Sequence, residues 1–465
     1  MTSELAPRER LLVPRIRTPE GELAAALRRI RDELELPAGF PAAVEAEAAV
    51  VEPDLPSLDR TDIPFVTIDP AGATDLDQAM HLERRGDGYR VRYAIADVPA
   101  FVRPGGAIDA EARRRGQTLY APDGRIPLHP TRISEGAASL LPGQIAPAFV
   151  WEFELDAAGT VERTTLTRAM VRSTRRLSYV EAQEQPDPLL REIGELRIEQ
   201  ERARGGASLD RPDQEVVREG GRYRLIRRRP LPVENWNAQL SLMTGMAAAR
   251  IMLDGGVGLL RTMPAPDEET LAAFRMRVAA LGLPWPEGQP YGEYLRSLDR
   301  DSAAALAVLQ SAGSLFRGAG YTAFDGAVPD DVVQAAVAAP YAHTTAPLRR
   351  LVDRFVLVTC HALLDGREVP GWVREALPGL PKIMNRSDGL AGRLERASVD
   401  AIEAALLHGR EGEEFDAVVI AEGSVQLDEP PVTAKLEGDA PVGERVRVRL
   451  VTADITAGIT LLRPV

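Results

Sequence analysis

The stretch 65–80 constrains the fold more than any other part of the sequence. It begins with an apolar, β-branched run, Phe65–Ile68, which is typical of a buried strand. The chain then enters a loop rich in Pro, Gly, Ala and Thr, which interrupts regular structure. Three aspartates, Asp69, Asp75 and Asp77, follow the apolar run. The sequence therefore predicts a strand that leads into a cluster of acidic side chains.

Size and composition indicate an ordinary globular protein with several domains. The 465 residues are enough for about three domains of the usual size. Hydrophobic residues make up 45% and charged residues 27% of the chain, and no apolar run is long enough to span a bilayer. The first residues have no apolar signal segment, and the single cysteine, Cys360, lies in an apolar run. We therefore expect a soluble cytoplasmic protein that needs no membrane and no disulfide.

The net charge of −13 argues against a nucleic-acid partner, because such binding depends on phosphate neutralisation by Lys and Arg. However, Lys382 and Lys435 are the only lysines among 56 basic residues. The planar guanidinium of arginine suits phosphate, although codon composition also produces such a skew. Local clusters of charged residues are therefore more informative about a nucleic-acid partner than the net charge of the whole chain.

The two ends of the chain differ from the middle in the secondary structure that their sequence patterns predict. Residues 1–55 show two amphipathic helical patterns before a linker rich in Pro and Asp, and predict a small helical module. It could serve as a structural lid or as an RNA contact. Residues 411–465 contain five short β runs from Phe415 onward, which favours an oligonucleotide-binding (OB) barrel over a plain packing domain.

The middle region, residues 56–410, predicts a mixed α/β (α+β) domain. Two hairpins are expected, one around Gly86–Gly88 and one between the alternating apolar run 149–155 and residues 161–173. Helical patterns follow from about residue 233 onward. An acidic loop that is flanked by paired strands would be held more rigidly than a loop without such strands.

A second chemically distinctive stretch is 341–354, Y-A-H-T-T-A-P-L-R-R-L-V-D-R. Pro347 can open a helix that carries Arg349 and Arg350 in its first turns. Cations at that end oppose the helix dipole, which suggests an anionic partner such as a carboxylate or a phosphate. The structural alternative is an ion pair between Arg349 and Asp353, four residues later.

The acidic loop has the spacing of a cation site. Asp75 and Asp77 would share one side of an extended chain, and Asp69 would reach back from the strand end. Carboxylates this close repel one another unless a cation such as Mg²⁺ or Mn²⁺ lies between them. A pair of such ions can stabilise both the attacking and the leaving oxygen in phosphodiester hydrolysis. The alternative is a surface loop rich in turn-forming aspartate.

Several separated motifs occur together in one order. They read I-D-P-A-G-A-T-D-L-D-Q-A, A-I-A-D-V, A-R-R-R-G-Q-T-L-Y-A-P-D-G-R-I-P-L-H-P, S-E-G-A-A-S-L-L-P-G and Y-A-H-T-T-A-P-L-R-R-L-V-D. From about residue 60 to residue 400 the chain closely resembles the ribonuclease II (RNB) family. The resemblance implies a processive 3′-to-5′ exoribonuclease that hydrolyses single-stranded RNA to 5′-mononucleotides with two Mg²⁺ ions. A C-terminal OB barrel of the ribosomal-protein S-one type and a monomeric chain fit this expectation.

The resemblance also implies roles for individual residues. Asp77 and Arg349 match catalytic positions, Arg349 as the group that grips the scissile phosphate. Tyr120 matches an aromatic residue that stacks on bases, a contact worth about 1–3 kcal/mol per base. The full set expected is Asp69, Asp75, Asp77 and Gln78 for the metal and Tyr120, Arg350 and Glu395 for RNA.

Gln78 departs from the family pattern, which usually has a fourth aspartate at that position. A glutamine carbonyl can coordinate a hard ion but adds no charge, so weaker metal binding is expected. One alternative is therefore a catalytically impaired RNA-binding relative. Another is a metal-dependent enzyme that acts on a different phosphoester. The 55 residues before the linker also look too short for the paired cold-shock barrels of the family.

Overall fold

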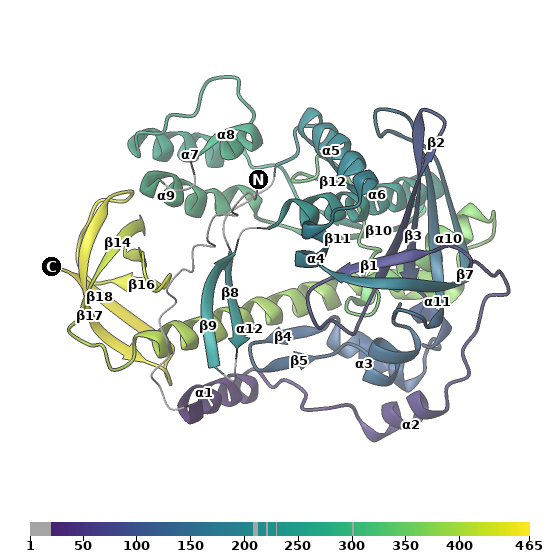
Figure 1. The fold of residues 1–465 in the computed structure, drawn as a ribbon, viewed down its shortest axis with the longest axis horizontal. Coiled ribbons are helices and arrows are strands. Elements are labelled where there is room, and N and C mark those ends of the chain that lie inside the picture. Colours follow the sequence, from purple (N-terminus) through teal and green to yellow (C-terminus); the bar gives the residue numbers. More distant parts are fainter. Residues whose placement is uncertain (1–19, 208–212, 220–221, 229, 300–301) are drawn as a thin grey trace, which may run out of the picture.

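The computed structural model describes residues 20–207, 213–219, 222–228, 230–299 and 302–465. Two closed β-barrels lie toward opposite ends of the molecule, and the long helix α12 (Leu380–Leu407) runs between them (Figure 1). In the part of the chain that is described, no helix combines the length and the apolar character needed to cross a membrane. The site described below lies beside the first barrel.

The first barrel has five strands and contains the acidic loop. Its strands β1 and β7 pair in parallel, and the other neighbours are antiparallel. Tyr93, Phe149, Trp151 and Phe153 are almost fully buried in a core that the strands share with the surrounding helices. The predicted strand and both predicted hairpins are confirmed, whereas closure into a barrel was not predicted. The strands are β1 (Phe65–Asp69), β2 (Gln78–Arg85), β3 (Gly88–Ala96), β6 (Ile145–Leu155) and β7 (Val161–Ser178).

The two predicted N-terminal helices exist, as α1 (Glu20–Glu33) and α2 (Ala42–Val50). They pack into different cores, since α1 lies against α12 and α2 lies against α3 (Ala107–Arg115). Glu47 of α2 accepts a hydrogen bond from the backbone nitrogen of Ala107 at 2.5 Å, at the start of α3. Thr18 and Pro19 have the sequence signals of a helix start and predict that the first helix begins there, but both lie outside the described residues. The domain limits near residues 55 and 410 stay predictions.

Helices surround the first barrel and connect it to the rest of the chain (Figure 1). The α-helices not yet named are α4 (Tyr179–Glu184), α5 (Pro188–Ala203), α6 (Pro232–Gly255), α7 (Glu268–Ala280), α8 (Tyr291–Ser297), α9 (Ala303–Ala312), α10 (Leu351–Leu364) and α11 (Gly371–Ala376). Short two-stranded sheets are formed by β4 (Leu119–Ala121) with β5 (Gly124–Ile126), β8 (Asp213–Glu219) with β9 (Arg222–Arg228), β10 (Val257–Thr262) with β11 (Gly320–Asp325), and β12 (Val333–Gln334) with β13 (Ala339–Pro340).

The predicted helix start at Pro347 is wrong, because α10 begins only at Leu351. Arg349 and Arg350 lie before the helix, and Arg350 has an extended backbone. The Arg349 carbonyl accepts from the nitrogen of Thr118 at 2.9 Å, and the nitrogen of Leu351 donates to the carbonyl of Gly116 at 3.0 Å. Tertiary hydrogen bonds therefore override the local helix-start signal.

The expected ion pair between Arg349 and Asp353 is also wrong. Asp353 instead accepts from Arg350 Nε at 2.5 Å and from Arg350 Nη2 at 2.8 Å. It also accepts from the backbone nitrogen of Ala346 at 2.7 Å, which fixes the turn before α10. Arg349 is thereby left to face the acidic loop.

The C-terminal region forms the second closed barrel, which confirms the five predicted strands. The strand order is β14-β15-β16-β18-β17. Val419, Val425, Leu427 and Val448 are fully buried in its core. Its strands are β14 (Glu414–Ala421), β15 (Ser424–Leu427), β16 (Thr433–Leu436), β17 (Arg445–Asp454) and β18 (Ile459–Pro464).

Candidate active site

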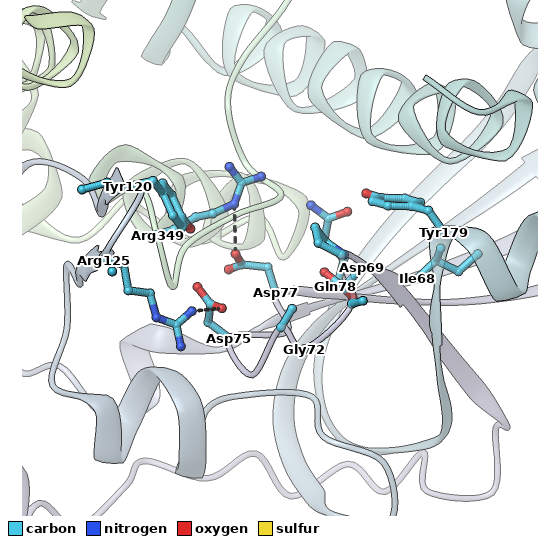
Figure 2. A pocket seen from close by; sticks show the side chains of 15 residues that line it. Ile68, Asp69, Gly72, Asp75, Asp77, Gln78, Tyr120, Arg125, Tyr179 and Arg349 are labelled. Carbon is cyan, nitrogen blue, oxygen red and sulfur yellow. Dashed lines mark hydrogen bonds and ion pairs between the residues drawn. The ribbon is translucent and has the colours of Figure 1, made fainter. Parts of the chain in front are cut away.

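A cavity of about 580 Å³ opens where β1 ends and β2 begins (Figure 2). Asp69 comes from the end of β1 and Gln78 from the first position of β2, with the acidic loop between them. The hairpin β4–β5 and the segment before α10 contribute from other parts of the chain. The cavity gathers six of the predicted site residues: Asp69, Asp75, Asp77, Gln78, Tyr120 and Arg349.

Asp77 is the most deeply buried acid of the cavity, with only 4% of the residue exposed. Its Oδ1 accepts from the backbone nitrogen of Leu348 at 2.7 Å, and its Oδ2 lies 3.4 Å from Arg349 Nε. Burial raises the pKa of Asp77 well above its usual range, although Arg349 and the Leu348 hydrogen bond oppose the rise. Positive charge is therefore needed beside this carboxylate to keep it ionised.

Asp69 has a carboxylate oxygen that is available to a ligand. Its Oδ2 is buried and has no hydrogen-bond partner among the residues that the structure describes. Burial, followed by the charge of Asp75, raises the pKa of Asp69 to about 6. A buried acceptor without a partner is costly, so this oxygen is suited to a ligand that brings positive charge.

Asp75 is held by an arginine that the sequence analysis did not single out. Arg125 Nη1 donates to Asp75 Oδ1 at 2.5 Å, and Arg125 Nη2 lies 2.8 Å from Glu135 Oε1. Arg125 stands opposite Tyr120 in the hairpin β4–β5. The turn Pro122–Gly124 could have indicated this hairpin, but only the fold brings Arg125 to Asp75.

Gln78 lines the same cavity, and its side-chain oxygen is already engaged. The hydroxyl of Tyr93 donates a hydrogen bond to Gln78 Oε1. Tyr93 lies on β3 and is almost fully buried, and no sequence motif predicted a role for it in the site. In the sequence Tyr93 alternates with Val91 and Ile95, which is typical of a strand with one buried face. This pattern does not indicate that Gln78 is the hydrogen-bond partner of the Tyr93 hydroxyl.

A second cavity of about 380 Å³ adjoins the first, since Tyr120 and Arg349 line both. Tyr120 is 55% exposed, and the Arg349 side chain is 46% exposed. Arg350 and Glu395, both expected to contact RNA, line this second cavity only. The two cavities thus form adjoining spaces from α12 to the acidic loop.

Comparison with known proteins identifies the family. Residues 58–366 match the RNB domain, and residues 413–465 match the RNase II-type exonuclease C-terminal S1 domain. The chain belongs to the RNB family. It is 30% identical over 352 residues to ribonuclease R of Escherichia coli, which covers 69% of this chain and 42% of the relative. Ribonuclease R of Aquifex aeolicus is 27% identical over 422 residues, which covers 83% of this chain and 58% of the relative. The chain therefore spans about two fifths of the E. coli protein.

Solved structures share the fold at low sequence identity. Mycoplasma genitalium RNase R in complex with ribose methylated single-stranded RNA has a TM-score of 0.87 and 18% identity, and covers 96% of this chain and 78% of that chain. Yeast Ssd1, a pseudonuclease, has a TM-score of 0.69 and 17% identity, and covers 93% of this chain and 57% of that chain. The fold thus also occurs in a protein described as a pseudonuclease, so the residues of the site must decide the function.

RNB ribonucleases depend on divalent metal ions, and the chemistry of this cavity fits such an ion. Asp69, Asp75 and Asp77 supply carboxylate oxygens, the ligands that hard cations prefer, and the unsatisfied oxygen of Asp69 is one of them. Within the described ranges, no three His, Cys, Asp or Glu side chains converge closely enough to hold an ion. The donor set is therefore of the right chemical kind, and two of its members, Asp75 and Asp77, are paired with Arg125 and Arg349.

Proposed function

We propose that the chain is a hydrolytic 3′-to-5′ exoribonuclease that shortens single-stranded RNA and releases 5′-mononucleotides. The observation that carries the proposal is that three buried or half-buried aspartates and Arg349 meet around one cavity in an RNB domain. The relatives named ribonuclease R support the same activity. We further propose that the protein acts as a monomer in the cytoplasm and degrades RNA processively.

The adjoining cavities suggest how the RNA would lie. A single strand would pass along α12, beside Glu395 and Arg350, and reach the acidic loop with its 3′ end. Tyr120 borders both cavities and is half exposed, so its ring is available to stack on a base. Arg350 would contribute little net charge, because both of its bonding nitrogens are paired with the carboxylate of Asp353.

Asp69, Asp75 and Asp77 would hold the divalent cation, for which we propose Mg²⁺ and, on the family resemblance, two ions. When bound, the metal supplies positive charge against the negative charge that develops on the phosphate during hydrolysis. Arg349 would bind a non-bridging oxygen of the scissile phosphate through its exposed guanidinium. Asp77 would orient Arg349, which already lies 3.4 Å from it.

A catalytically impaired RNA-binding protein is the second candidate. Two observations favour it: Gln78 contributes no negative charge to the cavity, and the pseudonuclease Ssd1 shares the fold. Both candidates predict RNA binding. They differ only in whether mononucleotides appear.

The test is degradation of single-stranded RNA by the purified chain in Mg²⁺ or Mn²⁺, with one sample labelled at the 5′ end to follow shortening and one labelled throughout to follow released nucleotides. The proposed function predicts progressive shortening and release of 5′-mononucleotides, with no reaction in EDTA. A DNA of the same sequence is the control, because comparable cleavage of DNA would point to an enzyme for another phosphoester. Adding unlabelled RNA after the reaction has started tests processivity, since a processive enzyme finishes the strand that it holds.

Three outcomes would change the proposal. RNA binding without mononucleotide release would favour the impaired protein. Release of longer fragments from internal cuts would exclude an exonuclease. Dissociation from half-shortened RNA would exclude processive action while leaving the direction of degradation intact.

A further inference from the structure

We propose that Gln78 acts as a hydrogen-bond donor to an RNA phosphate rather than as a metal ligand, and that Tyr93 holds it in that orientation. The inference deepens the proposed function and rests on it. It replaces the expectation that the Gln78 carbonyl would coordinate an ion. The active site would then contain three anionic positions and one neutral donor.

The first step is the contact between Gln78 and Tyr93. The Tyr93 hydroxyl donates to Gln78 Oε1, and Tyr93 is only 1% exposed. The contact follows from the sheet register, since Gln78 pairs with Ile95 and Met80 pairs with Tyr93. Residues two apart on a strand share a face, so Tyr93 is the diagonal neighbour of Gln78.

The second step is that breaking this hydrogen bond has a high free-energy cost. Tyr93 pairs with Trp151 and lies in the buried core that the strands share with the helices, where an unpaired hydroxyl would be costly. Its hydrogen bond to Gln78 therefore holds the side-chain oxygen at the Tyr93 hydroxyl. A carbonyl oxygen that accepts this hydrogen bond does not point toward a cation in the cavity.

The third step concerns the other end of the amide. A glutamine side chain carries its two N–H donors on the nitrogen, on the opposite side from the oxygen. Figure 2 shows the amide of Gln78 above Asp69, with its nitrogen on the side of Arg349. Asp69 Oδ2 has no hydrogen-bond partner within the described part of the chain, so the amide is not committed to that oxygen.

The fourth step is the chemistry of the cavity. An N–H donor repels a metal ion but binds an anion, and the exposed guanidinium of Arg349 lines the same cavity. A phosphate oxygen between the two would receive a charged and a neutral donor. Hydrogen bonds to a charged acceptor are stronger than neutral ones, so this contact can add to the affinity for RNA.

The test separates metal binding from RNA binding and needs no catalysis. Mn²⁺ binding is measured without RNA by electron paramagnetic resonance, and RNA binding is measured in EDTA with a fluorescent single strand. Gln78→Met removes the side-chain carbonyl and N–H groups while keeping a similar volume, and Gln78→Leu repeats the test with another apolar side chain. Gln185→Ala is the control, because Gln185 follows α4 outside this cavity.

If Gln78 is a donor, Gln78→Met leaves the Mn²⁺ affinity within about twofold and weakens RNA binding roughly tenfold or more. Tyr93→Phe frees the carbonyl, so it should strengthen Mn²⁺ binding and weaken RNA binding. Gln185→Ala should change neither. Circular dichroism of each variant confirms that the fold is retained.

A loss of Mn²⁺ affinity of about tenfold or more in Gln78→Met would identify a metal ligand and overturn the proposal. Unchanged RNA and Mn²⁺ binding in both Gln78 variants would overturn it as well. Failure of the proposed function looks different, since it is the absence of mononucleotide release by the unmodified chain. A protein that binds RNA through Gln78 but does not cut it would keep the inference and exclude the nuclease.

Discussion

The two barrels of this chain have the same number of strands, and both carry arginine–acid pairs on their strands, but the first barrel also gathers acids at one strand end. In the first barrel, acids lie at the junction of β1 and β2, where Asp77 is 4% exposed and Asp69 has an oxygen without a partner among the described residues. In the second barrel, arginines on β17 and β18 pair with acids on its surface. The pairs are Arg445–Asp428, Arg447–Asp416, Arg449–Glu414 and Arg463–Glu437, at 2.5–2.8 Å.

The difference shows that the place of a charge on the barrel decides its chemistry. Exposed pairs on strand faces are screened by water and contribute little energy. Carboxylates at a buried strand end are poorly hydrated, so they take up either a proton or a cation. The acidic strand end of the first barrel therefore favours a bound cation, whereas the four arginines named on the second barrel are already paired with acids.

The largest expected effect comes from removing the buried charge of Asp77. Asp77→Asn should lower mononucleotide release at least about 100-fold, because a metal-binding and arginine-orienting charge is lost. The amide oxygen can still accept from Leu348, and burial penalises the charge it replaces, so the melting temperature should not fall. The measurements are single-turnover RNA degradation and thermal unfolding.

Asp87→Asn is the matched control for this variant. Asp87 lies in the turn between β2 and β3, away from the cavity, and is exposed. It should keep full activity. Full activity in Asp77→Asn as well would remove Asp77 from the catalytic site.

The next effect is on stability and depends on pH. Without metal, Asp69 has a pKa of about 6 in the folded chain and 3.8 as its ordinary value. Because the folded pKa is the higher one, this group stabilises the fold below about pH 4, and that stability is lost as the pH rises through 6. The loss corresponds to about 3 kcal/mol.

Chemical unfolding in EDTA between pH 4 and pH 7, compared with Asp69→Asn, isolates this contribution from that of other acids. The stability difference between the two proteins should change across this range. Adding Mg²⁺ at pH 7 should restore stability to the unmodified chain, since the metal binds the folded state. Parallel pH curves for the two proteins would show that Asp69 does not titrate as its burial implies.

A smaller effect is expected at Tyr120, which borders both cavities. Tyr120→Ala should weaken binding of single-stranded RNA by about 1–3 kcal/mol, the usual contribution of one stacked base. Tyr120→Phe keeps the ring and should bind almost as well. Fluorescence titration in EDTA measures both. Equal losses in the two variants would assign the effect to the hydroxyl and not to stacking.

Local sequence patterns predicted the elements around the site correctly. The apolar run Phe65–Ile68 became β1, and the five β runs after residue 414 became the second barrel. Such patterns succeed because strand alternation is set by neighbours in the sequence. The three aspartates were close enough in the chain to be placed together by spacing alone.

The contacts that refine the site could not be predicted in this way. Arg125 is 50 residues from Asp75, and Tyr93 is 15 residues from Gln78 across a strand pair. Both contacts depend on barrel register and closure, which no local pattern reports. The helix signal at Pro347 failed for the same reason, because backbone bonds to residues 116–118 hold Arg350 in an extended conformation before the helix.

The smallest effect is expected on the second barrel, at Arg447. Its guanidinium is 52% exposed and already lies within 2.8 Å of Asp416 and 3.5 Å of Glu414. Because these acids compensate its charge, Arg447→Ala should leave the melting temperature and the rate of mononucleotide release unchanged. RNA binding measured over a range of salt concentrations should keep its slope. A slope reduced by about one would mean that Arg447 leaves its acids to bind a phosphate, and the second barrel would then use its charges as the first does.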